Sequence, residues 1–499
     1  MGDIPRMPSS PVPDLFPALP EIFLIVAAMG LLLVGVWHVD PNSGGRAPSA
    51  RLISRLGLLV LAVAVVLVLI VGAREPLISF GGMFVVDDFV VFFKILVLMA
   101  AAVSLFIAQD YLELHNASRF EFTVLMIFAS VGMLMMISAN DFLALYIGLE
   151  LQSLCLYVLA AFQRDDVKSS EAGLKYFVLS ALASGLLLYG ISLVYGFAGA
   201  TNFDALAVAF QQYADAAPPI GLITGIVFIL SGLAFKISAV PFHMWTPDVY
   251  DGAPTPATAF FSVGPKLAAV ALLLRVMMEP FADLVGQWQQ IIILISIGSM
   301  VLGAFGALGQ ANIKRLMAYS SIGNVGYALI GLAAGTRAGI SSVMIYMAIY
   351  LVTNLGAFAC ILSMRRRDKM VVGVADLAGL SKTHPAMALA MAIFMFSLAG
   401  IPPLAGFFAK IYVFFAAMDA GLWALAIIGV LSSVVAAYYY IRIVKIMYFD
   451  EVTQPLDRHI GRDVGVVMLG TSVVVLLFFV YPEPLLAGAA DAAVSLFTR

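Results

Sequence analysis

The sequence predicts an all-α polytopic membrane protein with 14 transmembrane helices, and three observations support this fold class. Of the 499 residues, 62% are hydrophobic and only 11% are charged, whereas roughly 25% are charged in a typical soluble protein. The apolar residues gather in runs of about 18 or more, long enough for a helix to cross a hydrocarbon core about 30 Å thick. These runs lack the alternation of every second residue that a transmembrane β-barrel requires. A soluble fold is therefore excluded.

The helices are placed on the apolar runs in chain order. About 14 spans of about 22 residues would use roughly 308 residues, which is close to the apolar share of the chain. The predicted helices lie near 16–37, 52–73, 86–108, 122–139, 142–162, 172–197, 220–243, 257–278, 289–309, 313–334, 340–363, 386–417, 421–448 and 464–486.

Two of these helices carry proline in mid-course. The seventh contains GLAFKISAVPFH (232–243), and the twelfth contains SLAGIPPLAGFFAKIY (397–412). Because proline removes a backbone donor and clashes with the preceding turn, we expect an unwound element near Pro241 and another near Pro402 and Pro403. A lysine lies beside each break. Matched interrupted helices indicate a transport site near the membrane midplane, although prolines in membrane helices also occur without function.

The two breaks predict an internal repeat. If helices 4–8 and 9–13 are two five-helix units, the broken helix is the fourth of each, and the odd number of helices inverts the second unit in the membrane. This arrangement divides the chain into an N-terminal three-helix segment (1–121), a first repeat (122–280), a second, inverted repeat (281–450) and a C-terminal helix 14 (451–499).

The distribution of basic residues predicts the orientation. Connections after odd-numbered helices hold seventeen Lys and Arg residues, whereas the opposite face holds only Arg6, Arg74, Arg337 and Arg499. Because cytoplasmic loops are enriched in Lys and Arg, we expect both termini on the non-cytoplasmic side. The N-terminal sequence lacks a secretory signal. No basic patch indicates nucleic acid, and Cys155 and Cys360 cannot form a disulfide framework or an iron–sulfur motif, so a metal site is not expected.

Six basic residues fall inside the predicted helices, where a charge costs about 2.5–3.5 kcal/mol and needs a reason. Lys94 is near enough to a helix end to extend to the interface, so a structural role is favoured. Arg275 precedes Glu279 by four residues and predicts a structural ion pair. Lys175 lies one turn inside its helix, and both interpretations stay open. The remaining three, which lie too deep to reach water and are predicted to be functional, are Lys236, Lys266 and Lys410.

Glu150 is the acidic counterpart of these lysines. It lies nine residues after Asp141, a rise of about 13.5 Å that places it near the midplane of the core. We therefore expect it to be buried in the bundle. Its alternative role is a structural ion pair between two helices, although such a pair seldom offsets its own desolvation.

Three segments resemble a known family. PFHMWTPDVYDGAPTPATAFFSVGPK (241–266), NIKRLMAYSSIGNVGY (312–327) and SLAGIPPLAGFFAK (397–410) are similar to the antiporter-like subunits of proton-pumping NADH-quinone oxidoreductase (respiratory complex I) and of multisubunit cation/proton antiporters. The third segment is most similar to the subunit N family. Subunit M has glutamate where this chain has Lys410, and subunit L continues into a long lateral helix after helix 14.

The resemblance implies a proton-transfer line of Glu150, Lys236, Lys266 and Lys410, with Lys175 a further contributor. Relatives often have histidine where this chain has Asn324, so proton passage there would need water or neighbouring groups. His243 keeps its place in the first segment, where a structural role and a role in proton uptake are both open.

The predicted function is that of a proton-translocating subunit of a redox-driven NADH-quinone oxidoreductase, a translocase of the bacterial inner membrane. The five histidines do not form mid-membrane pairs for haem, and no glycine-rich loop offers a dinucleotide site. Flavin, iron–sulfur clusters and quinone are therefore expected in partner subunits, among which are neighbouring antiporter-like subunits. The alternatives are a subunit of a multisubunit cation/proton antiporter, which the shared segments do not exclude, and a scaffold that has lost transport.

Overall fold

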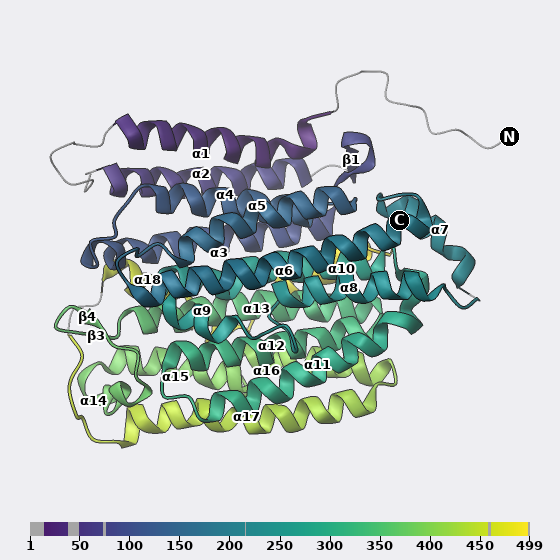
Figure 1. Ribbon diagram of the computed structural model, residues 1–499. Coiled ribbons are helices and arrows are strands. Elements are labelled where there is room, and N and C mark those ends of the chain that lie inside the picture. The colour runs from purple at the N-terminus through teal and green to yellow at the C-terminus, as the bar shows by residue number, and fades with distance from the viewer. Residues whose placement is uncertain (1–13, 38–48, 73–75, 215, 458–460, 498–499) are drawn as a thin grey trace.

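The computed structural model describes residues 14–37, 49–72, 76–214, 216–457 and 461–497. The described chain forms a bundle of long helices that run in alternating directions along one axis (Figure 1). Five basic residues used for the predicted orientation, and two histidines, lie outside the described residues; they are Arg6, His38, Arg46, Arg74, Arg458, His459 and Arg499.

The long elements follow the predicted runs closely. In chain order they are α1 (Leu19–Trp37), α2 (Ser49–Gly72), α3 (Asp88–Leu114), α4 (Glu121–Ile137), α5 (Phe142–Ala160), α6 (Val167–Ala198), α8 (Ile220–Lys236), α10 (Thr255–Met278), α11 (Val285–Leu308), α12 (Ile313–Ala334), α13 (Arg337–Leu362), α15 (Pro385–Ala399), α16 (Ala405–Asp419), α17 (Trp423–Phe449), α18 (Arg462–Leu477) and α19 (Glu483–Val494).

Among the described residues, ten helices are long and apolar enough to cross a membrane. The chain is therefore a multi-pass, mostly helical membrane protein. The total of 14 spans stays a prediction, because α4, α8, α15, α16 and α18 each have 17 residues or fewer. In each predicted five-helix unit the fourth helix is divided, as α8 with α9 (Thr246–Gly252) and as α15 with α16; the inverted relation of the units stays a prediction.

The predicted last helix, 464–486, is wrong as one element. The structure divides it into α18 and α19, with residues 478–482 between them. The break lies at Pro482, because proline lacks a backbone N–H donor and disfavours a helical conformation of the residue before it. A new helix can begin there, since the Pro482 carbonyl accepts the Leu485 N–H (3.1 Å) in the first turn of α19.

Several short elements were not predicted. The helix α7 (Phe203–Phe210) buries Phe203, Leu206 and Phe210, too short a pattern to stand out as an apolar run. Two antiparallel hairpins pair β1 (Leu77–Ser79) with β2 (Phe84–Val86), and β3 (Arg365–Arg366) with β4 (Lys369–Met370). Four more short helical segments are η1 (Phe16–Ala18), η3 (Phe80–Gly82), η6 (Val374–Leu377) and α14 (Leu380–Thr383), and η4 (Gln211–Tyr213) and η5 (Ala282–Leu284) are single 3₁₀ turns.

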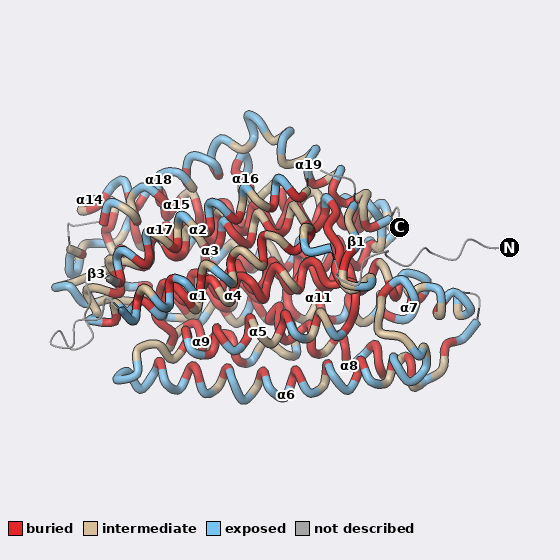
Figure 2. The backbone as a smooth tube through the Cα atoms, turned by 90° about the horizontal axis from the view of Figure 1, so that it is seen from above, coloured by how far each residue is buried: buried red, intermediate tan, exposed pale blue. Residues whose placement is uncertain are grey.

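The centre of the bundle consists of α10, α12 and α13. Every residue of α10 is buried, and nearly every residue of the other two is buried as well. Helices such as α6 lie at the outside and expose one side (Figure 2). Backbones approach closely where glycines face each other: a Cβ built on Gly132 of α4 would lie 2.7 Å from the Gly148 carbonyl oxygen of α5. This contact fixes how α5 is turned.

The connections fall at two ends of the bundle. The α3–α4 and α5–α6 connections lie at the same end as the β3–β4 hairpin and α14, whereas the β1–β2 hairpin, α7 and the last described residues lie at the other (Figure 1). This separation matches the alternation on which the orientation was predicted.

Two buried basic residues, Lys94 and Arg275, form ion pairs with carboxylates, as expected for a structural role. Lys94 does not extend to the interface as predicted: its side chain is only 2% exposed and pairs with Glu21 of α1 (Nζ–Oε1, 2.5 Å). Packing of α1 on α3 supplies this partner, which spacing along the chain could not reveal. The predicted pair of Arg275 with Glu279 is present (2.6 Å), and Arg275 also pairs with Asp87 (2.9 Å) at the start of α3.

Candidate functional site

Lys236 lies at the first helix break. It is the last residue of α8, and residues 237–245 leave the helical path, with Ser238 in the left-handed region (φ 63°). The Trp245 Nε1–H donates to the Phe235 carbonyl (3.1 Å), which satisfies one acceptor at the end of α8. The Lys236 ammonium is buried and donates to Ser153 Oγ of α5 (2.8 Å) and to Ser180 Oγ of α6 (2.7 Å). Its partners are thus hydroxyls.

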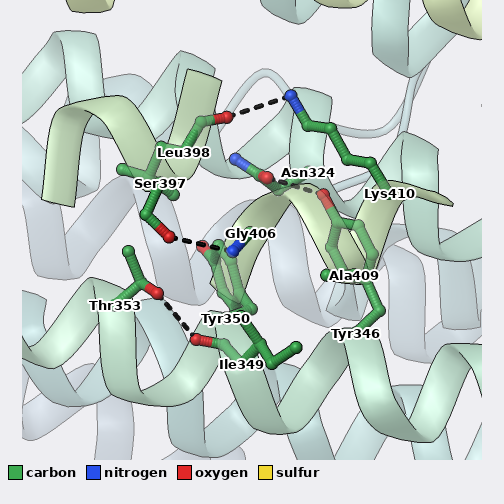
Figure 3. A pocket seen from close by; sticks show the side chains of 10 residues that line it. All are labelled: Asn324, Tyr346, Ile349, Tyr350, Thr353, Ser397, Leu398, Gly406, Ala409 and Lys410. Atoms are coloured by element: carbon green, nitrogen blue, oxygen red, sulfur yellow. Dashed lines mark hydrogen bonds between the residues drawn. The ribbon is translucent and has the colours of Figure 1, made fainter. Parts of the chain in front are cut away.

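Lys410 lies at the second break, on the opposite side of the interruption. The helix α15 ends at Ala399, and Gly400 turns the chain with φ +86° before α16 begins at Ala405. The buried Lys410 ammonium donates to the carbonyls of Leu398 and Ala399, each at 3.0 Å, and to Ser433 Oγ at 2.8 Å. Figure 3 shows the contact with Leu398. These carbonyls are free acceptors at the negative end of the α15 dipole, so the helix terminus stabilises the cation.

Lys266 lies between the two breaks, in the fully buried α10. Its ammonium donates to Ser321 Oγ of α12 and lies 5.6 Å from the ring centre of Tyr250. The Tyr350 hydroxyl of α13 donates to the same Ser321 oxygen at 2.9 Å. Ser321 therefore joins Lys266 to Tyr350.

A small cavity with a mixed polar and apolar lining continues from Tyr350 towards Lys410. It has a volume of about 10 Å³, and its lining includes Tyr350, Asn324, Ser397 and Lys410 (Figure 3). A cavity of this size holds about one water molecule when its walls are polar. The tertiary structure thus brings hydroxyl groups and a small cavity between two lysines that are 144 positions apart in the sequence.

Asn324 stands in a buried polar cluster beside this cavity. Its amide nitrogen donates to the Ser320 carbonyl (2.8 Å), and its oxygen accepts from the Tyr346 hydroxyl (2.7 Å). Ser320 Oγ and Tyr440 OH are 2.5 Å apart. Proton passage past Asn324 through water or neighbouring groups stays a prediction, and the polar groups beside it are Ser320, Tyr346 and Tyr440.

The burial predicted for Glu150 is wrong. It lies in the middle of α5, but its residue is only half-buried, because the close packing of α5 on α4 turns it towards an outer side of the chain. Glu150 Oε1 accepts from Ser184 Oγ of α6 (2.5 Å). Among the described residues no ion pair joins Glu150 to Lys236. Ser180 and Ser184, one turn apart on α6, lie between them.

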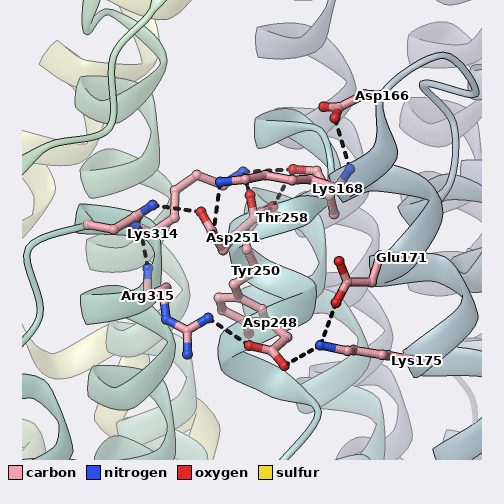
Figure 4. Close-up of polar contacts among 12 residues, drawn as sticks. Asp166, Lys168, Glu171, Lys175, Asp248, Tyr250, Asp251, Thr258, Lys314 and Arg315 are labelled. Atoms are coloured by element: carbon pink, nitrogen blue, oxygen red, sulfur yellow. Dashed lines mark hydrogen bonds and ion pairs between the residues drawn. The ribbon is translucent and has the colours of Figure 1, made fainter.

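Lys175 lies apart from the other predicted residues. Its side chain is 41% exposed and pairs with Glu171 (2.7 Å) and with Asp248 of α9 (2.8 Å). Asp248 also pairs with Arg315 of α12 (2.6 Å), and Figure 4 shows these contacts. Asp248 and Arg315 were missed by the sequence analysis, although both stand in segments that carried the family resemblance. Together with Lys175 they hold α9 beside the first break.

A group of stacked aromatic side chains lies beside Lys236. Tyr176 stacks on Trp245 with ring centres 4.4 Å apart, and the ring centres of Phe235 and Trp245 are 5.5 Å apart. Within the described part of the chain, no hydrogen bond connects the partners of Lys236 to those of Lys266. His243 lies half-buried between α8 and α9, and both of its proposed roles stay predictions.

Comparisons with known proteins agree on the family. The model of a family described as "NADH:quinone oxidoreductase/Mrp antiporter, TM" matches residues 139–436. A protein of Rhodospirillum rubrum named NADH-quinone oxidoreductase subunit N is 59% identical over 96% of this chain and 97% of its own length. Its namesake from Paramagnetospirillum magneticum is 57% identical over 97% of this chain and 98% of its own length.

Solved structures share the fold. A chain of respiratory complex I from Thermus thermophilus, solved with bound aureothin, superposes with a TM-score of 0.80 at 32% identity, covering 95% of this chain and 99% of that one. A chain of the Mrp complex from Dietzia superposes with a TM-score of 0.83 at 22% identity, covering 97% and 98%. The second likeness concerns the fold alone.

Proposed function

The chain belongs to the NADH-quinone oxidoreductase subunit N family, within the wider NADH:quinone oxidoreductase/Mrp antiporter family, and from this premise we propose that it moves protons through its buried lysines. It is an antiporter-like, proton-translocating membrane subunit. We place it in a redox-driven NADH-quinone oxidoreductase of the bacterial inner membrane, with transport from the cytoplasmic to the non-cytoplasmic side and both termini on the latter. Flavin, iron–sulfur clusters and quinone belong to its partner subunits, and its neighbours include other antiporter-like subunits.

One observation carries the proposal: the buried lysines of this chain fall into two kinds. Lys94, like Arg275, is paired with a carboxylate. Among the described residues, Lys236, Lys266 and Lys410 have no carboxylate within ion-pair distance, and their ammonium groups are held by hydroxyl and carbonyl oxygens. The buried Lys314 is held in the same way, by the carbonyls of Asp251 and Ala253, but it lies in the first turn of α12, outside the line of the other three. Burial disfavours the charged form and a carboxylate favours it. Residues of the second kind can therefore give up and regain a proton with little rearrangement.

Glu150 supplies the variable charge in this mechanism. With an effective dielectric of about 20, opposite charges attract by about 4 kcal/mol at about 4 Å and by about 2 kcal/mol at about 8 Å. A small movement of Glu150 relative to Lys236 therefore changes proton affinity by more than tenfold. Ser184 and Ser180 lie between the two residues and offer hydroxyls for the transfer.

The second half of the path runs from Lys266 to Lys410. Lys266 contacts Ser321, which accepts from Tyr350, and the small cavity beyond Tyr350 reaches Lys410. Each hydroxyl can accept one proton and donate another. We assign Lys175 a positioning role, because its ion pairs hold α9 beside the first break instead of reaching this path.

The test is proton pumping by the assembled complex in proteoliposomes, with NADH-driven quinone reduction measured in parallel. Lys236→Ala and Glu150→Ala should sharply reduce pumping, whereas Arg337→Gln, at an exposed residue on the opposite end of the bundle from the Lys175 cluster, serves as a matched control. Lys175→Ala should lower activity less than Lys236→Ala. Full pumping by both Lys236→Ala and Glu150→Ala would reject their roles.

The second candidate function is that of a subunit of a multisubunit cation/proton antiporter. It is kept because this chain shares its fold with a chain of the Mrp complex. The higher identity to proteins named subunit N favours the respiratory assignment. Purification separates the two: co-isolation with flavin and iron–sulfur subunits supports the first, and sodium-dependent growth without such partners supports the second.

A further inference from the structure

Two adjoining hollows lie on the outside of the chain, away from the proposed proton path. The inner hollow has a volume of about 320 Å³ and is lined by apolar side chains of α1, α4 and α5, among them Leu32, Phe128 and Val158. The outer hollow has a volume of about 330 Å³ and lies over the α3–α4 and α5–α6 connections. Both fall in the range of small-molecule pockets. Arg119 and Arg164 line both hollows, so the two form one groove with a cationic neck.

The chemistry of the groove changes in a fixed order. The inner part is apolar, with Glu121 as its one acidic lining residue. At the neck, Arg119 and Arg164 are exposed, and neither takes part in an ion pair within the described part of the chain. Beyond the arginines, the outer part is lined by two carboxylates, those of Asp165 and Asp166, and by the neutral or weakly basic side chains of His115, Asn116 and Gln163. Asp166 uses one carboxylate oxygen to accept the Lys168 N–H (2.9 Å) at the start of α6.

The position of the groove fits the membrane interface. Its lining includes residues of the α3–α4 and α5–α6 connections, and both connections lie at one end of the bundle (Figure 1). Basic pockets between membrane helices at such an interface bind lipid headgroups, and the planar guanidinium of arginine matches a phosphate with two parallel hydrogen bonds.

We propose that this groove binds a phospholipid with an amine headgroup, such as phosphatidylethanolamine. The acyl chains pack along Leu32, Phe128 and Val158, the phosphate lies between Arg119 and Arg164, and the ammonium group faces Asp165 and Asp166. The order apolar, cationic, acidic along the groove is the order acyl chain, phosphate, ammonium along this lipid. A lipid without the ammonium group would leave two carboxylates facing a phosphate of the same charge, which is unfavourable.

The experiment measures lipid retained by the purified, assembled complex. After delipidation in detergent, the complex is incubated with vesicles of phosphatidylethanolamine or phosphatidylglycerol, or with inorganic phosphate, and bound phospholipid is quantified by mass spectrometry. Wild type should retain phosphatidylethanolamine in preference, and Arg119→Gln/Arg164→Gln should weaken retention by about tenfold or more. Arg337→Gln, an exposed arginine elsewhere, should change nothing. Quinone reduction confirms that each variant is assembled.

A second variant tests the headgroup. Asp165→Asn/Asp166→Asn removes both charges while asparagine still caps α6, and it should abolish the preference for phosphatidylethanolamine over phosphatidylglycerol. Equal binding of both lipids by wild type, or unchanged preference in this variant, would overturn the headgroup assignment. If inorganic phosphate alone displaces the bound lipid, the neck formed by Arg119 and Arg164 is a site for a free anion, and the lipid proposal is overturned. A photo-crosslinker at Leu125 that captures a partner subunit instead of lipid would also refute the proposal.

Discussion

Tyr350→Phe removes one hydroxyl from the path between Lys266 and Lys410. That hydroxyl is buried, donates to Ser321 Oγ at 2.9 Å and lines the 10 Å³ cavity that reaches Lys410. The change deletes a single oxygen and keeps the ring, so packing around α13 is retained. We therefore expect the substitution to impair proton transfer through Ser321 and to leave the packing of the helices unchanged.

The magnitude follows from the cost of a buried polar group without its partner, about 1–3 kcal/mol. If that cost applies to the transfer step, the step slows by about 5- to 160-fold, since each 1.36 kcal/mol is a factor of ten. Pumping should fall strongly, and coupled quinone reduction should slow with it.

The assay is the number of protons moved per NADH oxidised in proteoliposomes holding the assembled complex. Tyr319→Phe, on the same helix as Ser321 but packed beside Gly306, is the matched control and should pump normally. If the Tyr350→Phe complex pumps at the wild-type rate with unchanged subunit content, the route through Tyr350 is refuted. Lys266 would then have no demonstrated connection to Lys410.

Three further outcomes are expected. Lys94→Met should destabilise the complex by about 3–5 kcal/mol because Glu21 is left buried without its partner, and Glu21→Gln/Lys94→Met should recover most of this in thermal melts; additive losses would contradict a paired role. Gly400→Ala should lower pumping, since φ is +86° there and a Cβ would lie 3.0 Å from Lys410 Cδ; normal pumping would show that the turn tolerates it. The backbone N–H groups of Asp368 and Arg367 donate to the Asp457 carboxylate and hold its pKa below the ordinary value. These hydrogen bonds therefore stabilise the β3–β4 turn above about pH 4, and the stabilisation is lost as the pH falls through the lowered pKa. Hydrogen exchange of the turn should show this pH dependence, and Asp457→Asn should lack it.

The sequence predicted the properties that depend on local chemistry. Runs of apolar residues predicted a multi-pass helical membrane protein, since polar backbone in a bilayer must be paired within helices. Prolines located both breaks, because a missing N–H acts on its own helix. The depth of Lys236, Lys266 and Lys410 followed from counting along helices, and it marked them as expensive to bury.

Tertiary packing decided what each charge contacts. Lys94 and Lys236 both fall inside predicted helices, yet α1 brings a carboxylate to the first and α5 and α6 bring only hydroxyls to the second. The turn of α5 on α4 left Glu150 half-buried, and α9 drew Lys175 into a cluster at one end. Partners of this kind come from helices far apart in the chain, so their identity depends on how helices pack and rotate, which no spacing within a single helix encodes.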